Sequence, residues 1–286
     1  MDFESFVKDI TDNKWNVFGV EVYKDGKLLH SFGDTEDNIH DIYSATKTIL
    51  SVALGIAIDK GMIDIDKCIP DYLPQDYTYN MKAPSKEAFG RITVRRLMTM
   101  SVGGFPFRPE GDNWLKSVLD LEPEETEVFN YSNVSAFLAG VALDTALGED
   151  LGLFIEREIF KPLGITNYEY GRSPEGYFYG ASKMKLSVHD LSKIGLLLTN
   201  GGVYKGKRIL SKEYTDMATS VQQMNREGGY GFFVWKYRNG FSINGKLKQK
   251  CYCLPEEGIV ITYLAHIEED APELKESMEK HILGIS

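Results

Sequence analysis

The stretch that decides the fold reads Ser44-Ala45-Thr46-Lys47-Thr48-Ile49-Leu50-Ser51-Val52-Ala53-Leu54-Gly55-Ile56-Ala57-Ile58. From residue 49 to residue 58 nearly every side chain is apolar, and a helix that is hydrophobic on all sides is buried on all sides. This apolar run is about half as long as the roughly 20 residues that a membrane-spanning helix needs. We therefore expect a buried central helix over residues 46–60 and no membrane span.

Two polar side chains, Ser44 and Lys47, stand at the start of this helix with the spacing that puts them on one face. A serine hydroxyl is a weak nucleophile until a neighbour takes its proton, and a lysine can do so when burial lowers its pKa. The same spacing recurs in charged segments at residues 5–8, 182–185 and 277–280. The alternative is that Ser44 only caps the helix and Lys47 extends its amine into solvent.

Strand patterns lie on either side of this central region. Residues 17–23 and 27–32 flank Asp25-Gly26, a pair favoured in two-residue hairpin turns. Further strand patterns cover residues 230–237, 249–254 and 259–265, with turns expected at Asn239-Gly240 and at residues 255–258. Because an isolated hairpin is marginal in water, we expect the two ends of the chain to pair in one antiparallel sheet.

Helical periodicity occupies the middle of the chain, at residues 94–100, 134–147, 151–160 and 188–198, and a last helix is expected from residue 272 to about residue 283. We therefore predict an α+β fold, in which an antiparallel sheet of N- and C-terminal strands is flanked by helices and carries an inserted, mostly helical lobe. The chain is expected to be a single domain over residues 1–286. Its α/β lobe would cover about 1–60 plus 205–286 and its helical lobe about 61–204, with a groove between them.

The charge balance argues against one class of partner. The formal net charge is −10 and the sequence pI is about 5.1. Affinity for nucleic acid comes chiefly from Lys and Arg side chains that neutralise phosphates. We therefore expect a small-molecule or peptide-like substrate and no nucleic acid, while the sequence leaves the oligomeric state open.

Cysteine and histidine usage gives no support for a metal or cofactor. Three cysteines are too few for a disulfide framework, and Cys251 and Cys253 alternate along a predicted strand, which indicates reduced thiols on one face of the core. The five histidines form no close pair, so we predict no metal and no cofactor. The acidic N-terminus lacks the pattern of a secretory signal, which predicts a cytoplasmic protein if Met1 is the native start.

A second polar motif, Tyr131-Ser132-Asn133, directly precedes the helix predicted at residues 134–147. A tyrosine with cationic neighbours can relay protons, and an asparagine amide can orient both a lysine and a substrate carbonyl. The alternative is a simple helix cap.

In this order, the Ser-x-x-Lys helix, the later Tyr-Ser-Asn and a glycine-bearing C-terminal strand resemble class C β-lactamases and the related penicillin-binding proteins and family VIII-type esterases. The resemblance extends over about residues 17–264 and includes residues 92–99, 160–165 and 186–198. It implies a β-lactamase/transpeptidase-like fold with Ser44 as the acylated nucleophile. It also implies that Lys47 and Tyr131 share the serine proton and later activate water, and that Asn133 helps to hold substrate.

The third motif of that family, Lys or His followed by any residue and Gly, falls on Ile243-Asn244-Gly245. Gly245 allows close approach of a substrate, and the resemblance implies an oxyanion hole made of the Lys246 and Ser44 backbone N–H groups. Ile243 departs from the pattern because hydrocarbon cannot bind a substrate carboxylate. Lys248 and Lys250, with the Lys246 side chain, either restore positive charge there or are solvated.

These observations predict a serine hydrolase that cleaves a small ester, amide, β-lactam or peptide-like substrate through an acyl-enzyme on Ser44. Ile243 favours an esterase or amidase over an efficient β-lactamase. The alternative is a non-catalytic ligand-binding or sensor module on the penicillin-binding scaffold. An α/β-hydrolase is disfavoured because the chain has no Gly-x-Ser-x-Gly motif.

Overall fold

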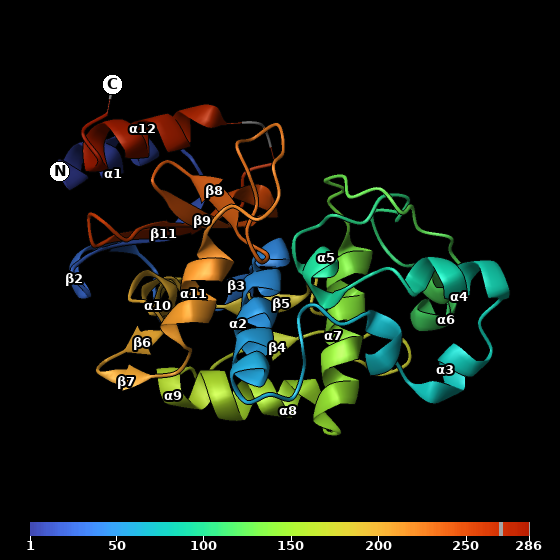
Figure 1. The fold of residues 1–286 in the computed structure, drawn as a ribbon. Helices are drawn as coiled ribbons and strands as arrows, with labels where there is room; N and C mark the ends of the chain where they lie inside the picture. Colours follow the sequence, from blue (N-terminus) through green and yellow to red (C-terminus); the bar gives the residue numbers. More distant parts are fainter. Residues whose placement is uncertain (269–270, 286) are drawn as a thin grey trace.

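The computed structural model describes residues 1–268 and 271–285, and a six-stranded antiparallel sheet organises them (Figure 1). The strand order is β2-β1-β11-β10-β9-β8. The strands are β1 (Val17–Lys24), β2 (Lys27–Gly33), β8 (Trp235–Tyr237), β9 (Gly240–Gly245), β10 (Gln249–Leu254) and β11 (Ile259–Ala265). The prediction that N- and C-terminal strands pair in one sheet is confirmed, because β1 of the N-terminal hairpin pairs with β11.

The two hairpin turns show where local sequence was sufficient and where it was not. Asp25 and Gly26 both have positive φ, as the predicted two-residue turn requires. The turn predicted at Asn239-Gly240 is wrong by one residue, because Tyr237 pairs with Gly240 and Arg238-Asn239 forms the turn. Gly240 belongs to the strand, where a Cβ would lie 2.0 Å from the Cys253 carbonyl oxygen.

Helices cover both faces of this sheet. On one face lie α1 (Phe3–Asp12), which the sequence analysis missed, and α12 (Pro272–Ile282), as predicted. The two helices pack side by side (Figure 1). On the other face α10 (Val188–Thr199) packs with Gly195 against two free and buried thiols, Cys251 and Cys253. Their sulfur atoms are 3.7 Å apart, which confirms the predicted core thiols on one strand face.

The apolar stretch forms α2 (Thr46–Asp59), which lies in Figure 1 between the sheet and α7 (Asn133–Leu147). Residues 46–57 of α2 are all buried, as its composition predicts. The predicted helix at 94–100 ends earlier, as α5 (Val94–Met98), because Met100 has a φ of 55°. The helix predicted at 151–160 divides into α8 (Leu151–Ile155) and a π-helical segment, Glu156–Phe160.

The remaining elements are short and connect the larger ones. The other helices are α3 (Gln75–Tyr79), α4 (Ala83–Phe89), α6 (Trp114–Leu119), α9 (Lys161–Leu163) and α11 (Lys212–Thr219). The other strands are β3 (His40–Asp41), β4 (Glu169–Tyr170), β5 (Met184–Leu186), β6 (Val203–Tyr204) and β7 (Lys207–Arg208). Strands β3, β5 and β4 form a small sheet of their own, and β6 pairs with β7.

The division into two lobes stays a prediction. Helix α10 lies within the range assigned to the helical lobe but packs on the sheet. Among the described residues, no helix has the length and apolar character that a membrane crossing requires.

Candidate active site

Ser44 lies in a tight turn, Tyr43–Ala45, immediately before α2. Tyr43 has a φ of 47°, and its carbonyl oxygen accepts a 2.7 Å hydrogen bond from the Thr46 hydroxyl. Strand β9 packs directly against this turn. At Gly245 a Cβ atom would lie 2.2 Å from the Ile42 carbonyl oxygen, so glycine is what allows the strand to approach the serine this closely.

Lys47 is 1% exposed, and its amine points back toward Ser44. The Nζ atom donates to Asn133 Oδ1 at 2.7 Å, to the Ala181 carbonyl oxygen at 2.8 Å and to Ser44 Oγ at 3.2 Å. Burial lowers the pKa of Lys47 from 10.5 to about 7. The alternative of a solvated lysine is wrong, and a sizeable fraction of the amine is neutral near pH 7, able to accept a proton.

The Tyr131 side chain lies next to Ser44 and Lys47. Burial raises the pKa of Tyr131 to about 12, and a side-chain hydrogen bond with Ser44 acts in the opposite direction. Its ring stacks on Trp235 with centroids 5.4 Å apart, and Lys47 Nζ lies 5.0 Å from the Tyr131 ring centroid. Near neutral pH Tyr131 is therefore a proton donor, while Lys47 is the available base.

Ser132 and Asn133 have different roles within the Tyr-Ser-Asn motif. The Ser132 side chain caps α7 by accepting a hydrogen bond from the Val134 N–H at 3.0 Å. Asn133 is the first residue of the helix, and its amide oxygen accepts from Lys47. The helix-cap alternative thus applies to Ser132 and leaves Asn133 to orient the lysine.

Of the third motif, Ile243-Asn244-Gly245, only the glycine is placed beside Ser44. Ile243 is fully buried in the core and pairs with Cys251 of β10, so we assign it a packing role and no contact with substrate. Lys250 pairs with Asn244 and faces α12, away from Ser44, and burial is the main cause that lowers its pKa to about 8. It therefore brings no charge to the site, whereas Lys246 is exposed at the end of β9.

A pocket of about 470 Å³ opens next to this group. Asn133 lines it together with Ser182, the neighbour of the Ala181 carbonyl that binds Lys47. The other lining residues are Phe107, Arg108, Pro109, Glu110, Gly111, Trp114, Tyr179 and Lys183. Asn133, whose amide oxygen accepts a hydrogen bond from Lys47, connects this pocket to the serine and lysine.

Comparison with known proteins shows the family of the chain. The sequence profile of the beta-lactamase family matches residues 8–281, which is nearly the whole chain. The chain belongs to the beta-lactamase family. The predicted resemblance and fold class are therefore confirmed at the level of the superfamily.

Individual relatives of this beta-lactamase family member are distant. A "Putative D-alanyl-D-alanine carboxypeptidase" of Salmonella gallinarum is 23% identical over 244 residues, covering 71% of this chain and 55% of that protein. The chain thus spans about half the length of the curated relatives that it matches. Two solved structures share the fold. An octameric penicillin-binding protein homologue from Pyrococcus abyssi has a TM-score of 0.73 and 20% identity, covering 100% of this chain and 78% of that one. A D-stereospecific amidohydrolase from a Streptomyces species has a TM-score of 0.71 and 17% identity, covering 100% of both chains.

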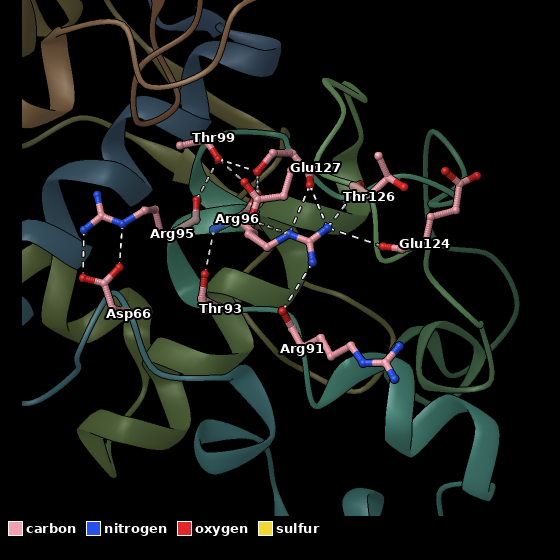
Figure 2. Close-up of polar contacts among 10 residues, drawn as sticks. Asp66, Arg91, Thr93, Arg95, Arg96, Thr99, Glu124, Thr126 and Glu127 are labelled. Atoms are coloured by element: carbon pink, nitrogen blue, oxygen red, sulfur yellow. Dashed lines mark hydrogen bonds and ion pairs between the residues drawn. The ribbon is translucent and has the colours of Figure 1, made fainter.

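In this member of the beta-lactamase family, a buried residue that sequence reasoning missed, Arg96, binds the loops that lead to the Tyr-Ser-Asn motif (Figure 2). Arg96 is 5% exposed, and its guanidinium donates to backbone carbonyl oxygens of two loops, with Glu127 at 3.7 Å as its charged partner. The acceptors are the carbonyl oxygens of Arg91, Ser101, Glu124 and Thr126. Between these loops the Met100 carbonyl oxygen accepts the Asn130 N–H at 2.7 Å. Arg96 therefore fixes the path of the chain that enters the Tyr-Ser-Asn motif.

A second polar cluster lies elsewhere in this beta-lactamase family chain. The potential metal-ligand atoms of Glu21, Glu36 and His189 lie within 4.8 Å of one another, a proximity that sequence spacing could not reveal. Glu21 is fully buried and already bonded, to His189 Nδ1 at 3.0 Å and to the Tyr23 hydroxyl at 2.9 Å. The hydrogen bond that His189 donates to Glu21 raises the pKa of His189. We interpret the cluster as a hydrogen-bond network and assign no metal to it.

Proposed function

We propose that this chain is a serine hydrolase that forms an acyl-enzyme on Ser44 and cleaves small ester, amide or peptide-like substrates. One observation carries the proposal. The amine of Lys47, withdrawn from water and bonded to an amide and a carbonyl, lies 3.2 Å from Ser44 Oγ. A neutral amine at that distance can take the hydroxyl proton.

In the proposed reaction the Lys47–Tyr131 pair accepts a proton and donates it again in each half of the cycle. Ser44 Oγ attacks the substrate carbonyl carbon while its proton passes to neutral Lys47, and the backbone N–H groups of Ser44 and Lys246 stabilise the oxyanion. The intermediate collapses to the acyl-serine, and the leaving group takes a proton from the Lys47–Tyr131 pair. Water then attacks the ester carbon and gives a proton to that pair. The second tetrahedral intermediate collapses, the pair returns the proton to Ser44 Oγ, and the acid is released.

An esterase or amidase is favoured over an efficient β-lactamase. The buried Ile243 offers no polar group on β9 to bind the carboxylate that penicillins carry. The names of the carboxypeptidase and the amidohydrolase reported above support amide bonds as one substrate class. The same observation on Ile243 favours the second candidate, a ligand-binding or sensor module without turnover.

Mass spectrometry after treatment with a fluorophosphonate or an activated ester tests the proposal. We expect an adduct on Ser44 that Ser44→Ala abolishes. Ser5→Ala is the matched control because Ser5 has the same spacing to a lysine, Lys8, on α1. An enzyme gives a burst of product followed by steady release, whereas a sensor stops at the burst. Absence of any Ser44 adduct with both reagents would refute the proposal.

A further inference from the structure

We propose that the pocket beside Asn133 binds a carboxylate on one arm of the substrate, so that this chain prefers anionic esters or amides over neutral ones. The inference rests on the proposed function, because the pocket serves the same Ser44. Two cations on its wall, Arg108 and Lys183, carry the argument.

Lys183 is held in place over an aromatic surface. It has a φ of 64°, and its stem packs on Gly171, where a Cβ would lie 2.6 Å from the Cβ of Lys183. Its ammonium lies 5.4 Å from the Trp114 ring centroid and 5.7 Å from that of Tyr179. Cation–π contacts of this kind keep the charge over the wall of the pocket without neutralising it.

Arg108 adds a second charge that acts on the same wall. Burial raises the pKa of Tyr179, while a hydrogen bond with Asn133 and the charge of Arg108 act in the opposite direction. The Tyr179 hydroxyl thus links the guanidinium side of the pocket to the residue that orients Lys47. An anion bound there would lie next to the catalytic group.

The local charge is opposite to that of the whole chain. Glu110 is the only carboxylate among the lining residues, all of which the structure describes, and it stands against two cations. No carboxylate between residues 1 and 268 or 271 and 285 forms an ion pair with Arg108 or Lys183. The net charge of the chain is −10, so its overall field repels anions and this pocket is a local exception.

The strand side of the site does not supply a comparable group. Ile243 is fully buried, and Lys250 faces α12. Lys246 is exposed at the end of β9, and the experiment includes it as a rival.

The test compares matched substrates in the full chain. One pair is p-nitrophenyl valerate and the p-nitrophenyl monoester of glutarate, which differ by a carboxylate on the acyl arm. The other pair is phenyl acetate and p-carboxyphenyl acetate, which differ on the leaving group. The readout is the ratio of kcat/KM for the anionic ester to that for the neutral ester, measured in wild type, Arg108→Gln, Lys183→Gln and the double variant.

We expect the double variant to lower this ratio about tenfold for at least one pair, since the two exposed cations each contribute modestly. Added salt should weaken the wild-type preference. Lys205→Gln is the matched control because Lys205 also has positive φ and lies over a tyrosine, 5.4 Å from the Tyr204 ring centroid, outside this pocket.

Three results would overturn the inference: equal ratios in wild type and double variant, dependence of the ratio on Lys246→Gln instead, or a preference for cationic esters through Glu110. All three leave the acyl-enzyme intact. Failure of the proposed function has another signature, namely hydrolysis of the neutral ester that survives Ser44→Ala.

Discussion

Lys47 and Lys193 are both withdrawn from water, with 1% and 7% of their surface exposed, and each amine has a side-chain partner at 2.7 Å and a backbone carbonyl close by. The partner of Lys47 is the amide of Asn133, whereas that of Lys193 is the carboxylate of Asp190. Nearly the same burial therefore has two outcomes. Lys193 forms an ion pair with Asp190 within α10 and donates a hydrogen bond to the Gly164 carbonyl oxygen. By contrast, the pKa of Lys47 falls to about 7.

The difference teaches what makes a buried lysine reactive in this fold. An amide can accept a hydrogen bond from either the charged or the neutral amine, so it orients Lys47 and stabilises its charge less than a carboxylate would. A carboxylate orients and also favours the ammonium. The choice of Asn at position 133 is thus as important to the proposed chemistry as the lysine itself.

Replacing Lys47 should have the largest effect. Lys47→Met keeps the approximate volume and removes the base, so we expect acylation of Ser44 by an activated ester to slow about a thousandfold. Stopped-flow acylation rates measure the effect, and circular dichroism with thermal unfolding checks the fold. Acylation at the wild-type rate in a folded variant would remove Lys47 from the mechanism.

A second experiment gives Lys47 a carboxylate partner like that of Lys193. In Asn133→Asp a carboxylate faces Lys47, and an opposite charge at this distance raises the pKa of a lysine by about 1–3 units. Wild-type kcat/KM for a neutral ester should rise with pH through about pH 7, because Lys47 acts only when deprotonated. In the variant the rise should move at least about one unit higher, lowering activity at pH 7 at least about fivefold.

Asn133→Ala separates this electrostatic effect from loss of a contact, because it removes the amide without adding charge. It should lower the rate without moving the pH profile upward. An unchanged profile in Asn133→Asp would show that the partner does not control the protonation of Lys47.

The reverse change at the other lysine should affect stability and leave catalysis nearly untouched. Asp190→Asn leaves the Lys193 ammonium buried without its counter-ion, which costs about 3 kcal/mol of unfolding free energy. Urea denaturation measures the loss, and ester hydrolysis per folded molecule should stay within about twofold of wild type, because residues that share no contacts act independently. A large fall in activity at unchanged stability would break the comparison.

Local pattern predicted much of this molecule. The Asp25-Gly26 hairpin, the buried α2 and the bounds of β10 and β11 follow from turn chemistry and periodicity alone. The juxtaposition of Ser44 and Lys47 follows from helix geometry, one turn apart.

The partners of those residues do not follow from local spacing. Asn133 is 86 positions from Lys47, and it was predicted to orient a lysine from the Tyr-Ser-Asn motif. Arg96 could not be predicted, because it acts through carbonyl oxygens, which leave no signature in side-chain identity. The pocket cations Arg108 and Lys183 come from distant segments that only the fold brings together. Helix α1 was missed because its role depends on α12, at the other end of the chain.

The contact between Gly245 and the Ile42 carbonyl is main chain against main chain. No side chain sets the separation of the strand from the nucleophile turn, so residues around this contact can be exchanged without shifting either one. Ile243 can therefore stand in the third motif without altering this contact. The side chain at position 243 and the approach of β9 to the turn that carries Ser44 are separately adjustable.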